Sequence, residues 1–151
     1  MTAEPLDDFI ALSATLTGFS AQELSGTGQA GPFRKLVAER AGTANLDALI
    51  AAHAALAGAQ DAEAGLRRDV FGDDRLGPLA RAVIKLWYLG TWRGLPADWH
   101  ESFGGSAVDT AVVPSASAYT EGLLWPAVGA NPSGAKPFGY GMWARPPRLS
   151  Q

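Results

Sequence analysis

The sequence predicts an all-α fold, in which a small helical bundle is followed by a long, irregular C-terminal arm rich in Gly, Pro and Trp. Two observations lead to this prediction. Apolar residues recur at helical spacing in several segments of the first part of the chain. Residues 90–151 then hold nine Gly and seven Pro in 62 positions, a composition that interrupts regular structure. With 47% apolar and 18% charged residues, the 151-residue chain has the composition of one folded domain.

The first helix is expected to start near Pro5 and to end at Gly18. Leu6, Phe9 and Ile10 fall three and four residues apart, so they share one face of a helix. Pro5 suits the first turn, because the backbone N–H that proline lacks has no helical partner there. Gly18 is a typical residue for the end of a helix.

Three further helices are expected before residue 71. The second begins at Pro32 and stops at Gly42. The third is capped by Asn45 and continues to Leu56, with its apolar residues on one face. Asp61–Val70 is expected to form a weaker, charged helix.

The strongest helical pattern runs from Leu76 to Trp92. Its apolar stripe consists of Leu76, Leu79, Ala80, Val83, Ile84, Trp87 and Tyr88. Arg81 and Lys85 lie one turn apart on another face of the same helix. A helix with so continuous a stripe buries one side along its whole length. We therefore predict that it is the core helix of the bundle.

The chain changes character after this helix. A helix around residues 100–112, with Asp98 as its cap, is still expected, but no periodic pattern continues beyond Pro114. We therefore predict a helical body over residues 1–113. An extended arm over residues 114–151 is expected to pack on that body, on a partner subunit, or on both.

The arm is expected to be ordered by contact. Residues 90–151 hold four of the five Trp, and only five of the 27 charged residues lie beyond Glu101. Disordered tails have the opposite composition, with few aromatics and many charges. Large aromatic side chains on an irregular backbone are typical of an interaction surface.

Charge and cysteine content exclude several functions. The net charge of −3 offers no basic excess for phosphates, so we expect no nucleic-acid partner. The absence of Cys excludes disulfides, iron–sulfur ligation, covalent haem and a thiolate nucleophile in this chain. The sequence shows neither a targeting segment nor an apolar stretch long enough to cross a bilayer, so we expect no direct membrane insertion.

Two segments match motifs of enzymes without the context that those motifs require. Gly26–Gly31 reads G-x-G-x-x-G, which binds dinucleotides only after a β-strand and before a helix. Because Ser13–Ser25 is interpreted as the end of a helix and a loop, we interpret the glycines as a flexible connection between helices. Ser133–Lys136 reads S-x-x-K, but Pro132 and Pro137 on either side prevent the helix that a serine nucleophile needs there.

The remaining titratable candidates have structural interpretations. His53 lies on the apolar face of the third helix and is expected in the core or in a helix–helix contact. His100 is expected at an exposed cap or at an interface. Asp73 and Asp74 are adjacent, so their side chains point apart, and we expect them to cap the following helix. We predict no catalytic, cofactor-binding or metal-binding residue in this chain.

Three segments carry a resemblance to a known family. Leu6–Gly18 reads L-D-D-F-I-A-L-S-A-T-L-T-G, and Ala82–Gly90 reads A-V-I-K-L-W-Y-L-G. Ala118–Trp125 reads A-Y-T-E-G-L-L-W and precedes a tail rich in Gly, Pro and Trp. In this order they resemble the small accessory subunits of bacterial flavin-dependent sugar and polyol dehydrogenases. These include the small subunits of sorbitol, fructose and glucoside 3-dehydrogenases and the gamma subunit of glucose dehydrogenases.

The resemblance implies a division of labour in a heteromeric complex. A large GMC-type subunit would bind FAD and remove hydride from a sugar carbon, and a cytochrome c subunit, where present, would pass the electrons on. The small subunit would hold no cofactor and would support folding, stability or export of the large one. Many members carry a Cys where this chain has Thr120. Many also begin with a twin-arginine leader, which is not seen here, so a periplasmic location in the complex and a cytoplasmic one both stay open.

The aromatic residues of the arm are the candidate contacts with the large subunit. The predicted partner interface consists of Tyr119, Trp125, Phe138, Tyr140, Trp143 and Arg145. Each aromatic side chain removes about 150–250 Å² from water when it is covered, and Arg145 would pair with acids on the partner. The alternative is a free-standing helical protein that binds a small ligand, with the arm folded on its own body.

Overall fold

The computed structural model describes residues 5–130, and every regular element in that range is helical apart from one isolated β-bridge between Trp92 and Val112. The predicted all-α fold is confirmed. The elements, in chain order, are α1 (Pro5–Thr17), α2 (Ala21–Gly26), α3 (Ala30–Ala41), α4 (Thr43–Ala55), α5 (Ala62–Leu66), the π-helical turn η1 (Arg67–Phe71), α6 (Leu76–Leu89), α7 (Ala97–Phe103), α8 (Ala116–Thr120) and α9 (Leu124–Val128).

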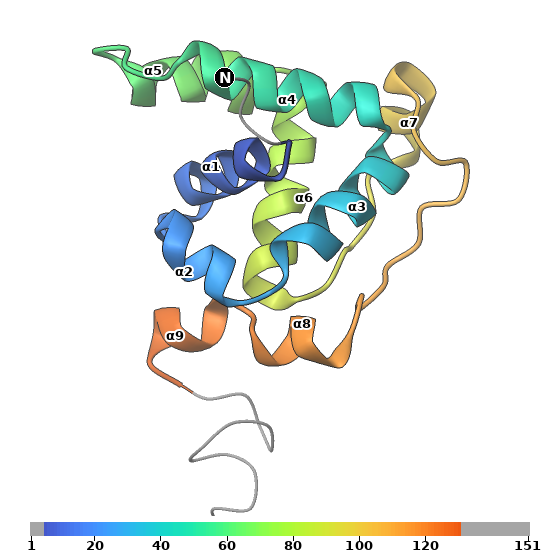
Figure 1. Cartoon of the computed structure of the whole chain (residues 1–151). Coiled ribbons are helices and arrows are strands. Elements are labelled where there is room, and N and C mark those ends of the chain that lie inside the picture. The colour runs from blue at the N-terminus through green and yellow to red at the C-terminus, as the bar shows by residue number, and fades with distance from the viewer. Residues whose placement is uncertain (1–4, 131–151) are drawn as a thin grey trace, which may run out of the picture.

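Helix α6 is the centre of the bundle, as the sequence predicts. Figure 1 shows it running through the middle of the molecule, and it contacts α1, α3, α4, η1, α8 and α9. Helices α4 and α5 lie across one end, while α8 and α9 lie at the opposite end (Figure 1). The chain therefore has two separate end faces, each made by different helices.

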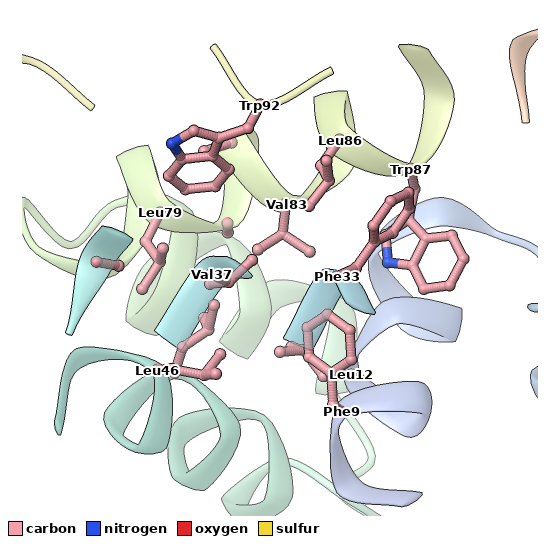
Figure 2. Packing of buried hydrophobic residues seen from close by; sticks show 14 of the residues in the cluster. Phe9, Leu12, Phe33, Val37, Leu46, Leu79, Val83, Leu86, Trp87 and Trp92 are labelled. Atoms are coloured by element: carbon pink, nitrogen blue, oxygen red, sulfur yellow. The ribbon is translucent and has the colours of Figure 1, made fainter. Parts of the chain in front are cut away.

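The core is built from apolar side chains of α1, α3, α4 and α6. Figure 2 shows Val83 of α6 among side chains from the neighbouring helices, with Val37 and Phe33 of α3 facing it. The ring of Trp87 stacks on Phe9 at 6.4 Å and meets the edge of Phe33 at 4.9 Å between centroids. All five side chains are at most 1% exposed. Close packing of this kind makes each of them sensitive to substitution.

The long periodic helices lie where the pattern places them, with small changes at their ends. Helix α3 begins at Ala30, two residues before Pro32. Helix α4 begins at Thr43, so Asn45 is not its cap. Asn45 is instead buried inside the helix, where its Nδ2 donates to the carbonyl oxygen of Phe103 at 3.0 Å. Asn45, a residue type that often caps helices, here joins α4 to the end of α7, which is distant in sequence.

Helix α6 ends earlier than predicted. It stops at Leu89 because Gly90 adopts the left-handed conformation, with φ of 67°, that ends helices. Trp92 therefore lies outside the helix, fully buried, in the β-bridge to Val112. Within the helix, Leu86 is buried and Ile84 is only half-buried, so the buried stripe is shifted slightly from the predicted one.

A short helix, α2, occupies a segment that the sequence pattern predicts to be a loop. Helix α2 begins after Ser20, whose Oγ accepts from the backbone N–H of Glu23, while the Glu23 side chain accepts from the N–H of Ser20. This reciprocal pair is a capping box, and its S-x-x-E signature was readable in the sequence. Leu24 anchors the helix in the core. The prediction of a loop over this part of the chain was wrong.

The expected charged helix over Asp61–Val70 is present in two parts. Helix α5 continues directly into η1, in which the backbone widens to a π-turn before Gly72. Val70 points into the core from this turn and is fully buried. The apolar residues of this segment do not recur at one constant spacing, because the winding changes from α-helical in α5 to π-helical in η1.

The helix predicted around residues 100–112 is displaced. Helix α7 covers Ala97–Phe103, its N-cap is Pro96 rather than Asp98, and Gly104 and Gly105 follow with φ of 89° and 90°. These two glycines end the helix, and the chain then runs without regular structure to the bridge at Val112.

Two five-residue helices, α8 and α9, follow Pro114, where no periodic pattern was found. Each is too short to repeat an apolar position more than once. The division of the chain into a body over residues 1–113 and an arm over residues 114–151 stays a prediction.

Candidate partner-binding surface

An apolar surface lies on α8 and α9, at the end of the bundle away from α4 (Figure 1). We call it the α8–α9 surface, and it consists of Tyr119, Leu124, Trp125 and Val128. Tyr119 is 39% exposed, Leu124 36% and Val128 64%, whereas Trp125 is half-buried. Tyr119 and Trp125 belong to the predicted interface. Leu124 and Val128 were missed, because two isolated apolar residues in a five-residue helix give no sequence signal.

The α8–α9 surface is held in place by close approach of backbone to backbone. The N–H of Leu123 donates to the carbonyl oxygen of Trp87 at 3.0 Å, and the side chains of Ala118 and Leu123 are buried. Gly90 lies against Ala118 so closely that a Cβ there would stand 2.3 Å from the Ala118 carbonyl oxygen. These contacts join α8 and α9 to the end of α6.

The two aromatic residues of this surface position one another. The indole Nε1 of Trp125 donates to the carbonyl oxygen of Tyr119 at 3.0 Å, and the two rings meet edge to face with centroids 5.6 Å apart. An edge-to-face pair with its N–H satisfied is a stable arrangement. The pair presents a preformed aromatic feature to anything that covers the surface.

A groove of about 270 Å³ separates α9 from α2 beside this surface. Phe19, Leu123 and Pro126 give it apolar walls, and the acidic residues Glu23 and Glu121 also line it. A partner side chain that combines an apolar stem with a cationic end matches this lining.

The other predicted interface residues, Phe138, Tyr140, Trp143 and Arg145, lie outside the described residues. The same is true of the Ser133–Lys136 motif. Their role in an interface therefore stays a prediction.

A second group of polar side chains converges on Asp109, a residue that was not predicted to belong to a site. The Asp109 side chain is only 3% exposed. Its Oδ1 accepts from Trp92 Nε1 at 2.6 Å and lies 3.5 Å from Arg40 Nη1. Its Oδ2 accepts from the N–H of Leu95 at 2.7 Å and lies 2.8 Å from His100 Nε2. One available signal was that Asp109 and Glu121 are the sole carboxylates after Glu101.

Hydrogen bonding sets the ionisation of this group. Burial raises the pKa of Asp109, but the hydrogen bonds from Trp92, Leu95 and His100, with the charge of His100, outweigh it and lower the pKa below its usual value. Burial lowers the pKa of His100, but the bonds to Asp109 and Gly104 and the carboxylate charge outweigh it and raise the pKa. His100 is 15% exposed and bonded, so it is not an exposed cap, while the alternative of an interface stays a prediction.

His53 and Asp73 have the structural roles that the sequence predicts. His53 Nε2 of α4 lies 2.7 Å from Thr15 Oγ1 of α1, which makes it a helix–helix contact, and burial lowers its pKa. Asp73 Oδ1 accepts from the N–H groups of Arg75 and Leu76 at the start of α6.

The Gly26–Gly31 motif joins α2 to α3. No β-strand precedes it within the described part of the chain, so the context for a dinucleotide site is missing there. Within residues 5–130, no three His, Asp or Glu side chains gather as a metal site, and no helix has the length and apolar character to cross a membrane.

These observations define the class of protein: it is a small all-α protein with an apolar, aromatic surface at one end of its bundle. A family model described as membrane bound FAD containing D-sorbitol dehydrogenase matches residues 1–122. The chain belongs to this family, which confirms its resemblance to the small accessory subunits of FAD-dependent sugar dehydrogenases. No curated protein and no solved structure matches it. The family match ends at Gly122, so α9 lies beyond it.

Proposed function

We propose that this chain is the non-catalytic small subunit of a heteromeric FAD-dependent, GMC-type sugar, polyol or glucoside dehydrogenase, and that it supports folding, stability or export of the large catalytic subunit. Membership of the family is the observation that carries the proposal. The α8–α9 surface supports it, because apolar side chains exposed together mark a site that another surface covers.

The partner interface is proposed to begin at the α8–α9 surface and to continue along the arm, residues 114–151. Tyr119 and Trp125 are its preformed part, and Phe138, Tyr140 and Trp143 extend it. Residues 131–151 carry two Arg, one Lys and no Asp or Glu. The matching surface on the large subunit is therefore apolar with acidic groups at its edge, and Arg145 pairs with one of them.

The cofactor is proposed to lie in the large subunit. The Gly26–Gly31 motif of this chain opens from a helix, so it does not fit the strand–turn–helix cradle of a dinucleotide. The large subunit would bind FAD and oxidise the CH–OH group, and a cytochrome c subunit, where present, would accept the electrons. The complex is proposed to work in the periplasm, as the resemblance implies, with the cytoplasm as the alternative.

Co-purification tests this proposal. The tagged chain is co-expressed with a large GMC-type flavoprotein chain of the same genome, and the eluate is examined for a second chain and for flavin absorbance. A yellow complex with sugar or polyol dehydrogenase activity is expected. A colourless small protein, eluting alone and monodisperse in several such co-expressions, would contradict the proposal.

A matched pair of variants tests the interface. Val128 and Val108 are similarly exposed, at 64% and 69%, but only Val128 lies on the α8–α9 surface. Val128→Asp is expected to weaken binding of the large subunit at least tenfold, because it places a charge in an apolar contact, while Val108→Asp is expected to leave it unchanged. Equal binding by the two variants would remove α9 from the interface.

A second candidate is a free-standing protein that binds a small ligand. The observation in its favour is a groove of about 360 Å³ between α1, α4 and α5, where Leu56 and Leu66 form apolar walls and Thr15 and His53 supply a polar end. This candidate predicts a stable monomer that binds small apolar molecules with one hydrogen-bonding group. A thermal-shift screen of the full chain, repeated with His53→Leu, tests it.

A further inference from the structure

Residues 104–112 form an irregular segment that is fastened to the body by polar contacts, and we call it the strap. It follows α7 and leads towards α8 along one side of the molecule (Figure 1). The N–H of Ser106 donates to the carbonyl oxygen of Arg40 at 3.0 Å, and Arg40 Nη1 donates to the carbonyl oxygen of Thr110 at 2.8 Å. Val112 and Trp92 exchange two backbone hydrogen bonds of 2.8 Å. Val112 also packs against the hydrophobic core, whereas Val108 is 69% exposed.

Both ring nitrogens of His100 face hydrogen-bond acceptors. His100 Nδ1 lies 2.7 Å from the carbonyl oxygen of Gly104, which can only accept a hydrogen bond. His100 Nε2 lies 2.8 Å from Oδ2 of Asp109, which also only accepts while the carboxylate is ionised. A neutral imidazole has one N–H and satisfies one of these two partners. The two contacts together are therefore those of an imidazolium.

The Asp109 carboxylate joins the strap to three other parts of the chain. It accepts from the indole of Trp92 and from the N–H of Leu95, and it faces the imidazolium of His100 on α7. Because the Asp109 side chain is almost fully buried, these donors, rather than water, stabilise its negative charge. Loss of one donor therefore disturbs the whole group.

We propose that the strap is a pH-operated clamp, which is closed while His100 is an imidazolium and Asp109 a carboxylate and which loosens when His100 loses its proton. Deprotonation leaves one lone pair of the ring pointing at an acceptor, either the carbonyl of Gly104 or the carboxylate of Asp109. The repulsion is relieved when the strap moves away from α7. This inference concerns the chain by itself and does not depend on the proposed function.

The charges around the pair are compatible with such a clamp. Arg40 of α3 lies on the Oδ1 side of Asp109, and its charge favours the carboxylate. Glu101 of α7 lines the same cleft as His100 and Asp109 but is exposed to solvent. The remaining neighbours, Trp92, Leu95 and the ring of Trp99 at 5.2 Å from that of His100, do not titrate between pH 4 and 9.

The direction of the pH effect follows from the shifts. The pKa of His100 is raised above its usual 6.5, so its contribution to stability is complete below 6.5 and disappears as the pH rises through the raised pKa. The pKa of Asp109 is lowered below 3.8, so its contribution is complete above 3.8 and disappears as the pH falls through the lowered pKa. The clamp is closed in mildly acidic solution and opens on the alkaline side first.

Amide exchange and ring titration in the full chain test the clamp. The His53→Gln variant leaves His100 as the single histidine, so NMR of its ring gives one titration curve. Exchange at the amides of Ser106 and Val112 is measured from pH 5.5 to 9 and corrected for intrinsic rates. The amide of Gly90, which is bonded to Leu86 in α6, is the internal reference. Protection of the strap amides is expected to fall at least tenfold relative to Gly90, with its midpoint at the His100 titration.

Two results would overturn the proposal. One is strap protection that stays constant while His100 titrates, or whose midpoint lies more than one pH unit from that titration. The other is the same pH dependence in His100→Gln, which keeps a side-chain donor but cannot titrate. Because His100→Gln is not needed for the first comparison, the proposal remains testable if that variant fails to fold.

Discussion

The helices α1 to α6 and the segment from Thr91 to Ala130 are stabilised in different ways. The first region is held by a continuous cluster of apolar side chains in which Phe9, Val83 and Trp87 are almost wholly buried. The second adds five buried apolar side chains to the same cluster, those of Trp92, Leu95, Trp99, Ala118 and Leu123. It is further attached through single polar groups and close backbone contacts, above all at Asp109 and Gly90. We expect the stability of the first region to depend mainly on the volume of its buried side chains. We expect the attachment of the second region to depend more on individual hydrogen-bonding groups.

This difference has a consequence for cooperativity. A side chain in the core contacts many neighbours, so its loss is shared by all the helices. A hydrogen-bonded carboxylate in the second region serves a few donors, and its loss releases one segment. Local opening of residues 91–130 without unfolding of the bundle is therefore the expected low-energy motion of this protein.

The largest effect is expected from Trp87→Ala in the core. Removing a fully buried indole that packs on Phe9 and Phe33 is expected to lower the free energy of unfolding by about 4 kcal/mol. Urea denaturation followed by circular dichroism measures it. Val108→Ala, at a residue 69% exposed, is the control and is expected to change stability by less than about 0.5 kcal/mol. A loss below about 1 kcal/mol for Trp87→Ala would show that the core is not the main source of stability.

A smaller but more local effect is expected from Asp109→Ala. The substitution leaves Trp92 Nε1, the N–H of Leu95 and the imidazolium of His100 without their acceptor, which is expected to cost about 3 kcal/mol. Hydrogen exchange should show the loss concentrated in residues 91–112. Glu101→Ala removes an exposed carboxylate from the same cleft and is expected to have little effect. Uniform loss of protection throughout the bundle would refute the contrast between the two regions.

An intermediate effect is expected from Gly90→Ala, because this glycine has two functions. Its left-handed conformation ends α6, and its missing side chain admits the carbonyl oxygen of Ala118. Gly18→Ala is a matched control, since Gly18 ends α1 with φ of 82° and has nothing within 4 Å of an added Cβ. We expect a loss of about 1 kcal/mol at Gly18 and about 2 kcal/mol at Gly90. Equal losses of stability in Gly18→Ala and Gly90→Ala would mean that α8 moves away from the added methyl group with no loss of free energy.

The sequence predicted the first region better than the second for a physical reason. Helices α1, α3 and α6 repeat their apolar residues over three turns or more, so the pattern locates the helices and most of the buried face, although Leu6 and Ile84 of the predicted faces are not buried. The contacts of the second region are not periodic. Arg40 and Asp109 are 69 residues apart, and no local rule indicates that they meet.

The candidate surface was predictable only in part. The concentration of aromatic residues in a segment with few charges indicated Tyr119 and Trp125, and the resemblance to a family supplied the kind of partner. The position of this surface at the end of α6 depends on the hydrogen bond between Leu123 and Trp87. Such a backbone hydrogen bond does not require particular side chains, so it cannot be predicted from the residue types.

The smallest effect is expected at α2, a helix of the first region that is marked in the sequence by its capping box rather than by a repeated apolar pattern. Ser20→Ala removes the acceptor for the N–H of Glu23 and is expected to lower stability by about 1 kcal/mol. Ser25→Ala, at an exposed position of the same helix, should be neutral or slightly stabilising, because Ala is the better helix former. Thermal unfolding of these two variants, of Glu23→Ala and of Ser20→Ala/Glu23→Ala separates the reciprocal hydrogen bonds from general helix propensity. If the capping box acts as a unit, the double variant loses less than the sum of its single substitutions. Strict additivity would mean that burial of Leu24, rather than the cap, determines where α2 begins.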